Sequence, residues 1–220
     1  MRKVNAIDHR LFAVDLPQPA LDSIQNGTRK IRYKGLRFCK NPFDIVLYLK
    51  ILEALKPQTI IEFGTSEGGS AVWFSDQCVA LGLNTEIHSF DLKMPAVTAQ
   101  NVTFHEADAY RPADTISATL LESLPHPWLV IEDSAHTFEA CLSVMQFFRP
   151  FILSGDYLVI EDGVVADLSD EQYRAFEDGP NRAVSEFLKY HGDQFEIDET
   201  YCDFFGHNVT YCPNGWLRRI

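Results

Sequence analysis

Short apolar segments alternate with segments of helical periodicity along this 220-residue chain, and this alternation limits the possible folds more than any other feature. The segments that we predict to be strands are residues 59–63, 86–90, 102–105, 128–131 and 157–160. Apolar residues recur at helical spacing in residues 43–55, 68–81, 115–124, 136–148 and 179–190. Alternation of this kind predicts a doubly wound α/β fold around a parallel sheet.

The two ends of the chain depart from this alternation. Residues 1–40 mix charge, Pro and Gly without a clear period, so we expect an irregular N-terminal extension that is either mobile or a cap over the substrate, followed by one domain at 41–220. Asn41 begins the first helix of that domain, and Asn181 is the expected N-cap of the last. Residues 195–200 and 206–220 predict a terminal antiparallel strand pair.

Composition excludes several classes of protein. A net charge of -12 would repel phosphate backbones, so DNA and RNA are disfavoured as partners. No stretch approaches the roughly 20 apolar residues of a membrane-spanning helix, and residues 1–15 lack the apolar centre of a signal peptide, so we expect a cytoplasmic protein without membrane contact. The 5 cysteines form no C-x-x-C pair, which favours reduced thiols over disulfides or a zinc site.

A glycine-containing loop connects the first predicted strand to its helix, which is typical of a nucleotide site. Ser66 stands where dinucleotide enzymes have their second glycine, and Glu62 precedes the loop. A carboxylate there holds an ammonium group and repels a pyrophosphate. The alternative is that the glycines only let the helix pack on the strand. The predicted cofactor contacts of this segment are Glu62, Gly64, Thr65, Ser66, Gly68, Gly69 and Ser70.

Two further carboxylates follow the next two strands. Asp91 ends the second strand, where it can accept hydrogen bonds from both ribose hydroxyls of a nucleoside. Asp108 follows the third strand and is similarly placed for the edge of an adenine ring. Each alone could be a solvated loop acid, but together they favour adenosine binding.

Acid pairs follow two neighbouring strands, Glu132 and Asp133 after one, Glu161 and Asp162 after the next. Because the carboxyl ends of parallel strands meet at one edge of a sheet, the two pairs converge and need a cation between them. Oxygen ligands without cysteine favour Mg²⁺, and we assign Asp133, Glu161 and Asp162 as its ligands. The alternative is that Asp133 and the following serine only cap the next helix.

His136 completes the first acid pair as a candidate general base. An ordinary pKa of about 6.5 allows its imidazole to take a proton at neutral pH. A nearby divalent cation would acidify a substrate hydroxyl by itself, in which case His136 only supports or binds substrate. The predicted catalytic residues are His136, Asp133 and Glu132.

The chain resembles the cephalosporin hydroxylase family of class I S-adenosylmethionine-dependent methyltransferases, which is related to macrolide and sugar O-methyltransferases. The resemblance covers about residues 40–220, and the motifs that carry it are residues 61–71, 133–136, 161–162, 179–184 and 208–217. It implies a Rossmann-like, mostly parallel seven-stranded sheet with S-adenosylmethionine beside Asp133. It also implies Mg²⁺ at Asp133, Glu161 and Asp162.

The function expected from this resemblance is O-methylation of a small molecule, a sugar or another natural product, with His136 or Glu132 removing the hydroxyl proton. Three alternatives stay open. An N-methyltransferase of an amino sugar or amine would depend less on a metal, and an NAD-dependent dehydrogenase would need the missing glycine of the loop. A non-catalytic S-adenosylmethionine-binding subunit would not need a cation site. A homo-oligomer is expected by analogy only.

Overall fold

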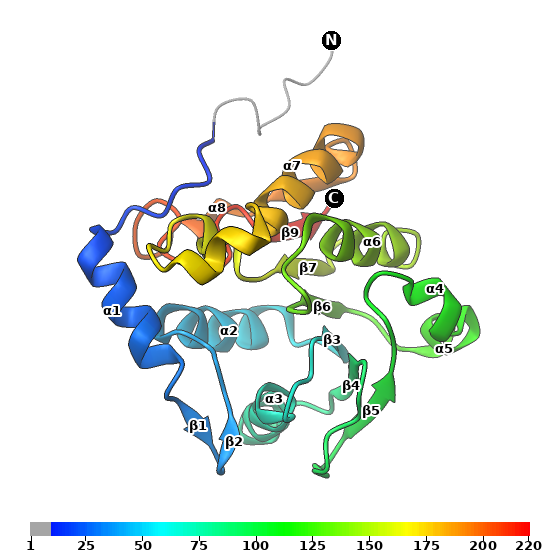
Figure 1. Cartoon of the computed structure of the whole chain (residues 1–220). Helices are drawn as coiled ribbons and strands as arrows, with labels where there is room; N and C mark the ends of the chain where they lie inside the picture. Colours follow the sequence, from blue (N-terminus) through cyan, green and yellow to red (C-terminus); the bar gives the residue numbers. More distant parts are fainter. Residues whose placement is uncertain (1–9) are drawn as a thin grey trace.

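The computed structural model describes residues 10–220, which fold around one seven-stranded sheet (Figure 1). The strand order is β5-β4-β3-β6-β7-β9-β8. Strands β3 to β7 pair in parallel, whereas β9 is antiparallel to both of its neighbours. The sequence-based prediction of a mostly parallel sheet with an antiparallel C-terminal pair is confirmed. The strands are β3 (Thr59–Phe63), β4 (Glu86–Asp91), β5 (Val102–Glu106), β6 (Trp128–Glu132), β7 (Tyr157–Ile160), β8 (Phe195–Ile197) and β9 (Trp216–Arg219).

The strand order reverses at β3, which pairs with β4 on one side and β6 on the other. Phe63, its last residue, is opposite Phe90 of β4 and Glu132 of β6. The loops that follow these strands therefore leave the same edge of the sheet side by side. Such a reversal is where doubly wound sheets bind their ligands.

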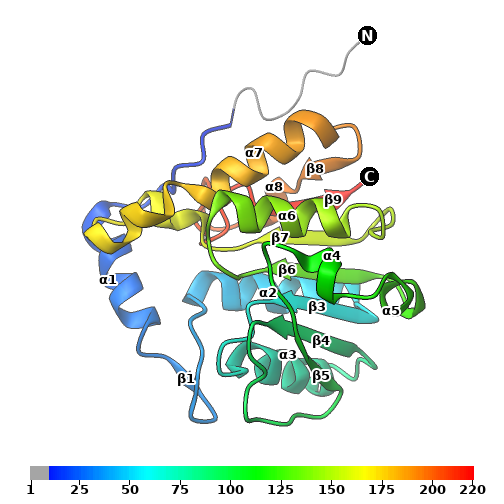
Figure 2. The ribbon, with the colours of Figure 1, turned by 45° about the vertical axis from the view of Figure 1, so that its right-hand side comes forward.

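Helices cover both faces of the sheet, with α2 and α3 on one face and α6 packed against α7 on the other (Figure 2). The ring of Tyr48 in α2 lies 5.0 Å from that of Phe74 in α3. The helix predicted at 115–124 is two short helices, because Ile116 and Ser117 between them have extended backbone. The α-helices that follow residue 41 are α2 (Pro42–Leu55), α3 (Gly69–Ala80), α4 (Pro112–Thr115), α5 (Ala118–Ser123), α6 (Phe138–Phe148), α7 (Gly179–His191) and α8 (Glu199–Cys202).

The three central strands carry the core. Every residue of β3, β6 and β7 is buried, which agrees with the apolar runs that predicted strands covered on both faces. Burying a side chain such as Leu129 or Ile131 contributes about 1.5–3 kcal/mol, so the central sheet is the rigid support of the loops at its edge.

The first residues of α2 and α7 can be compared with the two helix starts predicted from the sequence. Asn41 begins α2 as predicted, and it is the N-cap, with its Oδ1 accepting hydrogen bonds from the backbone N–H groups of Phe43 and Asp44. Asn181 is not the cap of α7: the helix begins two residues earlier, after Asp178, because Pro180 suits the first turn and needs no N–H partner. The Asn181 amide instead donates to the backbone carbonyl of Gly163 at 2.8 Å, joining α7 to the segment after β7.

The N-terminal segment is more regular than its sequence indicates. It contains helix α1 (Gln18–Thr28) and a separate hairpin of β1 (Arg32–Tyr33) and β2 (Leu36–Arg37). Leu21 of α1 packs with Val164 of η2 (Gly163–Ala166) and Tyr173 of η3 (Glu171–Phe176). Residues 1–9 of the predicted extension lie outside the described residues, and the boundary at residue 40 stays a prediction.

No helix within residues 10–220 has both the length and the apolar character needed to cross a membrane.

Candidate functional site

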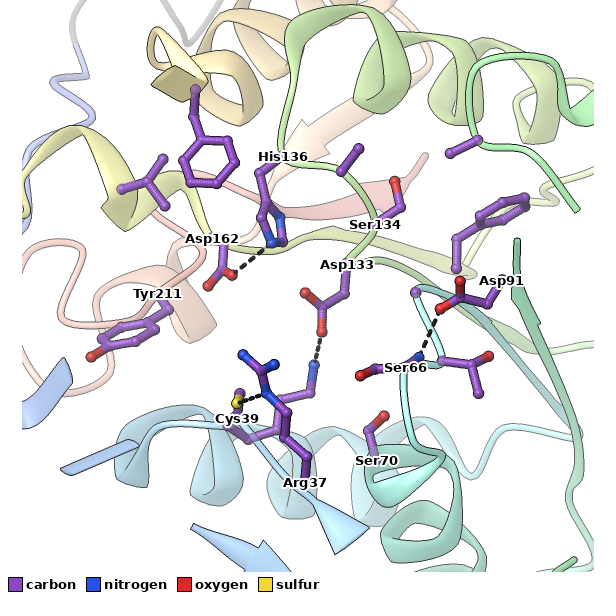
Figure 3. Close-up of a pocket in the computed structure, with 18 of the residues that line it drawn as sticks. Arg37, Cys39, Ser66, Ser70, Asp91, Asp133, Ser134, His136, Asp162 and Tyr211 are labelled. Atoms are coloured by element: carbon purple, nitrogen blue, oxygen red, sulfur yellow. Dashed lines mark hydrogen bonds and ion pairs between the residues drawn. The ribbon is translucent and has the colours of Figure 1, made fainter. Parts of the chain in front are cut away.

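A cavity of about 520 Å³ opens at the carboxyl ends of β3, β4 and β6 (Figure 3). Ser66 and Asp91 lie at one end, His136 and Asp162 lie toward the other, and Asp133 lies between them. The volume is in the range of small-molecule and cofactor sites. Its wall includes Gln25, Thr28, Arg29, Arg37, Phe38, Cys39, Lys40, Gly64, Thr65, Ser66, Ser70, Asp91, Leu92, Asp108, Ala109, Tyr110, Asp133, Ser134, His136, Asp162, Tyr173, Phe176 and Tyr211.

The end with Ser66 contains most of the predicted cofactor residues. The backbone N–H of Ser66 donates to Asp91 Oδ2 at 2.7 Å, so the glycine loop and the tip of β4 are held together. Asp108 also lines the cavity, as do the apolar residues Leu92 and Ala109. The backbone N–H of Ala107 donates to the Asp91 carbonyl at 2.8 Å, which places the end of β5 beside that of β4. A carboxylate next to an apolar slot suits a nucleoside, whose ribose is polar and whose base is flat.

Three residues predicted to contact the cofactor do not line the cavity, namely Glu62, Gly68 and Gly69. Glu62 is fully buried beneath the loop, accepts a hydrogen bond from Ser89 Oγ at 2.5 Å, and has its pKa raised by burial. A Cβ on Gly69 would lie 2.0 Å from the backbone oxygen of Arg37. The alternative interpretation, glycines that permit close packing, therefore describes Gly68 and Gly69.

Gly64 has a different structural role. Its φ is +108°, and a Cβ on it would lie 1.9 Å from the backbone oxygen of Asp133. Only glycine fits this contact, in both conformation and space. The loop after β3 is thereby brought directly against the loop after β6, so the nucleoside end of the cavity adjoins the acidic residues.

The two acid-bearing strand ends meet at Asp133, His136 and Asp162, which offer potential ligand atoms within 4.8 Å of one another. His136 Nε2 lies 3.3 Å from Asp162 Oδ2. His136 and Asp162 both have left-handed backbone, with φ of 55° and 58°. Conformations of this kind cost about 1–3 kcal/mol each and are concentrated at functional sites.

The carboxylates of the cluster shift the pKa of His136. Burial alone would lower the pKa of His136, but Asp162 and Asp133 outweigh that effect and raise it above its ordinary value. Nδ1 of His136 is buried, without a hydrogen bond to any of the described residues. A hard divalent cation fits this cluster, because two carboxylates are its preferred ligand type and the cluster already attracts positive charge.

Glu161, the third predicted ligand, lies deeper and is not part of the cavity wall. Its Oε1 accepts hydrogen bonds from Lys40 Nζ at 2.6 Å and from the Tyr48 hydroxyl at 2.5 Å. Lys40 Nζ also donates to Asp133 Oδ2 at 2.5 Å. Burial and the neighbouring Asp133 raise the pKa of Glu161 to about 7. Burial would lower the pKa of Lys40, but Asp133 and Glu161 raise it well above its usual value.

Glu132 also lies outside the cavity wall. It is fully buried, and its Oε1 accepts hydrogen bonds from the backbone and the hydroxyl of Ser134. In this position Glu132 holds the loop after β6 through Ser134. The N-cap of α6 is Thr137, whose Oγ1 accepts from the Ala140 N–H at 3.3 Å, so the interpretation that Asp133 is only a helix cap is wrong.

Sequence-based reasoning missed Lys40 and the far wall of the cavity, which α1, the hairpin and η3 provide. Lys40 is a single lysine in a segment without periodicity, and no motif marks it. The only signal was indirect: four predicted carboxylates at one place require more than one positive charge. The missed wall residues include Gln25, Thr28, Arg29, Arg37, Tyr173, Phe176 and Tyr211.

Comparison with protein families matches residues 25–220 to the model described as Rhamnosyl O-methyltransferase/CmcI. The chain belongs to this family. Among the relatives, the rhamnosyl O-methyltransferase of Mycobacterium tuberculosis strain H37Rv is 30% identical over 196 residues, covering 86% of this chain and 78% of the relative. That of Mycobacterium leprae is 29% identical and covers 85% of this chain and 82% of the relative.

Solved structures of the family agree with this assignment. One described as "cmcI-D160 Mg-SAM" is 26% identical, with a TM-score of 0.66 over 87% of this chain and 77% of its own. One described as "CmcI-N160 apo-structure" is 28% identical, with a TM-score of 0.68 over the same shares. The predicted Rossmann-like methyltransferase fold and the family are confirmed. S-adenosylmethionine and Mg²⁺ as cofactors are confirmed at the level of the family.

Proposed function

We propose that this chain methylates a hydroxyl of a small molecule, with S-adenosylmethionine as donor and a divalent cation at Asp133, Glu161 and Asp162. The observation that carries the proposal is the meeting of Asp133, His136 and Asp162 in the cavity that the glycine loop also lines. Family membership supports the same reaction, because the curated relatives are named O-methyltransferases.

The position of each residue in the cavity indicates its role in the proposed methyl transfer. S-adenosylmethionine supplies a methyl group on a sulfonium, and a bound cation would lower the pKa of a substrate hydroxyl. The Asp91 and Asp108 carboxylates bind the nucleoside and position it against the acidic residues. The His136 imidazole accepts the hydroxyl proton, and Asp162, 3.3 Å from its Nε2, stabilises the imidazolium that forms.

The acceptor that we propose is a sugar hydroxyl. The wall beyond His136 carries the aromatic residues Tyr173, Phe176 and Tyr211, whose faces suit the apolar face of a sugar ring. Polar groups lie among them: Gln25 Nε2 donates to the Tyr173 hydroxyl at 2.7 Å. This mixture of aromatic surface and hydrogen-bonding groups fits a hexose better than a long apolar acceptor, and the relatives are named for rhamnosyl groups.

The test is a methyl-transfer assay on glycosides of deoxyhexoses and on matched amines, with mass spectrometry detecting the added methyl. We expect an O-methylated product that is lost with EDTA and restored by Mg²⁺. Methylation of amines that survives EDTA would favour the N-methyltransferase instead. Binding of S-adenosylmethionine in calorimetry without turnover on any acceptor would favour a non-catalytic subunit.

We propose a small-molecule partner, in line with the cavity and the acidic net charge of -12. The absence of nucleic-acid partners, a cytoplasmic location and a homo-oligomeric state remain predictions from the sequence.

A further inference from the structure

A lysine ammonium lies between two carboxylates of the proposed metal site. Lys40 is 3% exposed, and its Nζ lies 2.5 Å from Asp133 Oδ2 and 2.6 Å from Glu161 Oε1. These carboxylates come from the ends of two different strands, β6 and β7. The ammonium therefore already joins two of the three groups that we propose as ligands of the divalent cation.

We propose that Lys40 is a built-in counter-ion that competes with the divalent cation for Asp133 and Glu161, and so sets the affinity of the site. This inference rests on the proposed function, because it concerns the cation that the methyl transfer would use. Mg²⁺ needs oxygen atoms at about 2.0–2.1 Å, closer than the ammonium lies. Two cations that share the same oxygen atoms repel each other strongly in a poorly hydrated site.

The surroundings of Lys40 allow it to give way. Its side chain lines the cavity, so the ammonium can move into that space when an ion arrives. Glu161 is held on its other side by the Tyr48 hydroxyl at 2.5 Å, which keeps this carboxylate in place during the exchange. The ammonium also explains how the Asp133 and Glu161 carboxylates stay close together before an ion binds, since unpaired charges in a poorly hydrated site are strongly unfavourable.

The competing interpretation is that Lys40 only orients the carboxylates and remains in place beside the ion. The two interpretations predict opposite effects of removing the charge. If Lys40 competes with the ion, removing its charge makes the metal-free protein less stable and makes the site bind Mg²⁺ more tightly. If Lys40 only orients the carboxylates, removing its charge leaves Mg²⁺ binding weaker or unchanged.

The experiment compares the wild-type protein with Lys40→Met by titration calorimetry with Mg²⁺ alone and by thermal unfolding with and without Mg²⁺. Lys34→Met is the matched control, because it removes the same charge from a side chain that is 59% exposed and pairs with Asp76, which lies outside the cavity wall. Lys40→Gln is the second variant in case Lys40→Met does not fold, and Lys40→Arg keeps the competing charge.

We expect Lys40→Met and Lys40→Gln to bind Mg²⁺ about tenfold more tightly or better, and to gain more thermal stability from Mg²⁺ than the wild-type protein. Lys34→Met and Lys40→Arg should match the wild-type affinity for Mg²⁺. Equal or weaker Mg²⁺ binding by both charge-removing variants, with normal binding by the wild-type protein, overturns this inference alone. Absence of Mg²⁺ binding in every protein, the wild type included, overturns the metal site of the proposed function as well.

Discussion

Removing one hydroxyl from the core next to the acid cluster tests whether Glu161 is held as the structure shows. Tyr48 is fully buried, and its hydroxyl donates to Glu161 Oε1 at 2.5 Å. Tyr48→Phe keeps the ring, whose centroid lies 5.0 Å from that of Phe74 and 5.0 Å from that of Trp216. The substitution therefore removes one hydrogen bond to a charged group and leaves the packing unchanged.

The expected loss follows from that single bond. At a pH above its pKa of about 7, Glu161 is ionised, and a hydrogen bond to a charged group contributes about 1.5–3 kcal/mol. Glu161 Oε1 retains Lys40 as a second donor, so we expect a loss of about 2 kcal/mol. For a domain of this length, that free energy lowers the melting temperature by about 4–8 °C.

Urea unfolding in EDTA, followed by tryptophan fluorescence, measures this loss without interference from bound metal. The control is Tyr201→Phe, because the Tyr201 ring stacks on Trp216 with 5.2 Å between centroids, and its hydroxyl makes no hydrogen bond within residues 10–220. We expect the control to stay within about 0.5 kcal/mol of the wild type. A loss for Tyr48→Phe no larger than that of the control would refute the arrangement around Glu161.

Three further predictions concern catalysis, packing and pH. His136→Gln should lower turnover about 100-fold or more while calorimetry still detects S-adenosylmethionine binding; unchanged turnover would exclude His136 as the base. Gly69→Ala should destabilise the protein, because its Cβ would lie 2.0 Å from a backbone oxygen of the hairpin. Gly27→Ala should stabilise the protein by about 0.4–1 kcal/mol, because its Cβ would meet nothing within 4 Å outside its own helix turn. Equal urea midpoints for the two variants would contradict this prediction. Burial lowers the pKa of His88 and of His105, whose ring nitrogens lie 3.0 Å apart. Below about pH 6.5 the unfolded chain therefore binds more protons than the folded protein, and the free energy of unfolding falls. His105→Gln should reduce that drop in urea unfolding between pH 7.5 and 5.5 (about one unit either side of 6.5), and an unchanged slope would count against this pair.

The sheet and the acidic strand ends could be predicted from sequence because their signals are local. The apolar runs of β6 and β7 have the length of buried strands, and an acid pair stands at the end of each. Because the four carboxylates would repel one another at neighbouring strand ends, they require a cation between them. Once the alternation establishes a parallel sheet, the edge at which those pairs meet follows from topology alone. Asn41 is a similar case, since its cap depends only on the residues directly after it.

Contacts between distant segments could not be predicted in this way. Lys40 is separated by 93 residues from Asp133 and by 121 from Glu161, and no local pattern connects a lysine to partners so far along the chain. Asn181 was misassigned because its side chain serves a contact with Gly163, which the sequence of α7 does not reveal. Helix α1 was missed because its stability comes from packing on the segments after β7.

The cavity end that we assign to the acceptor is built by α1, the hairpin and η3, none of which contributes a strand to the seven-stranded sheet. Insertions or replacements in α1 or η3 change none of the residues that set the strand registers or the contact between Gly64 and Asp133. Acceptor preference on this scaffold can therefore diverge in evolution by exchange of surface segments, while the donor end remains constant.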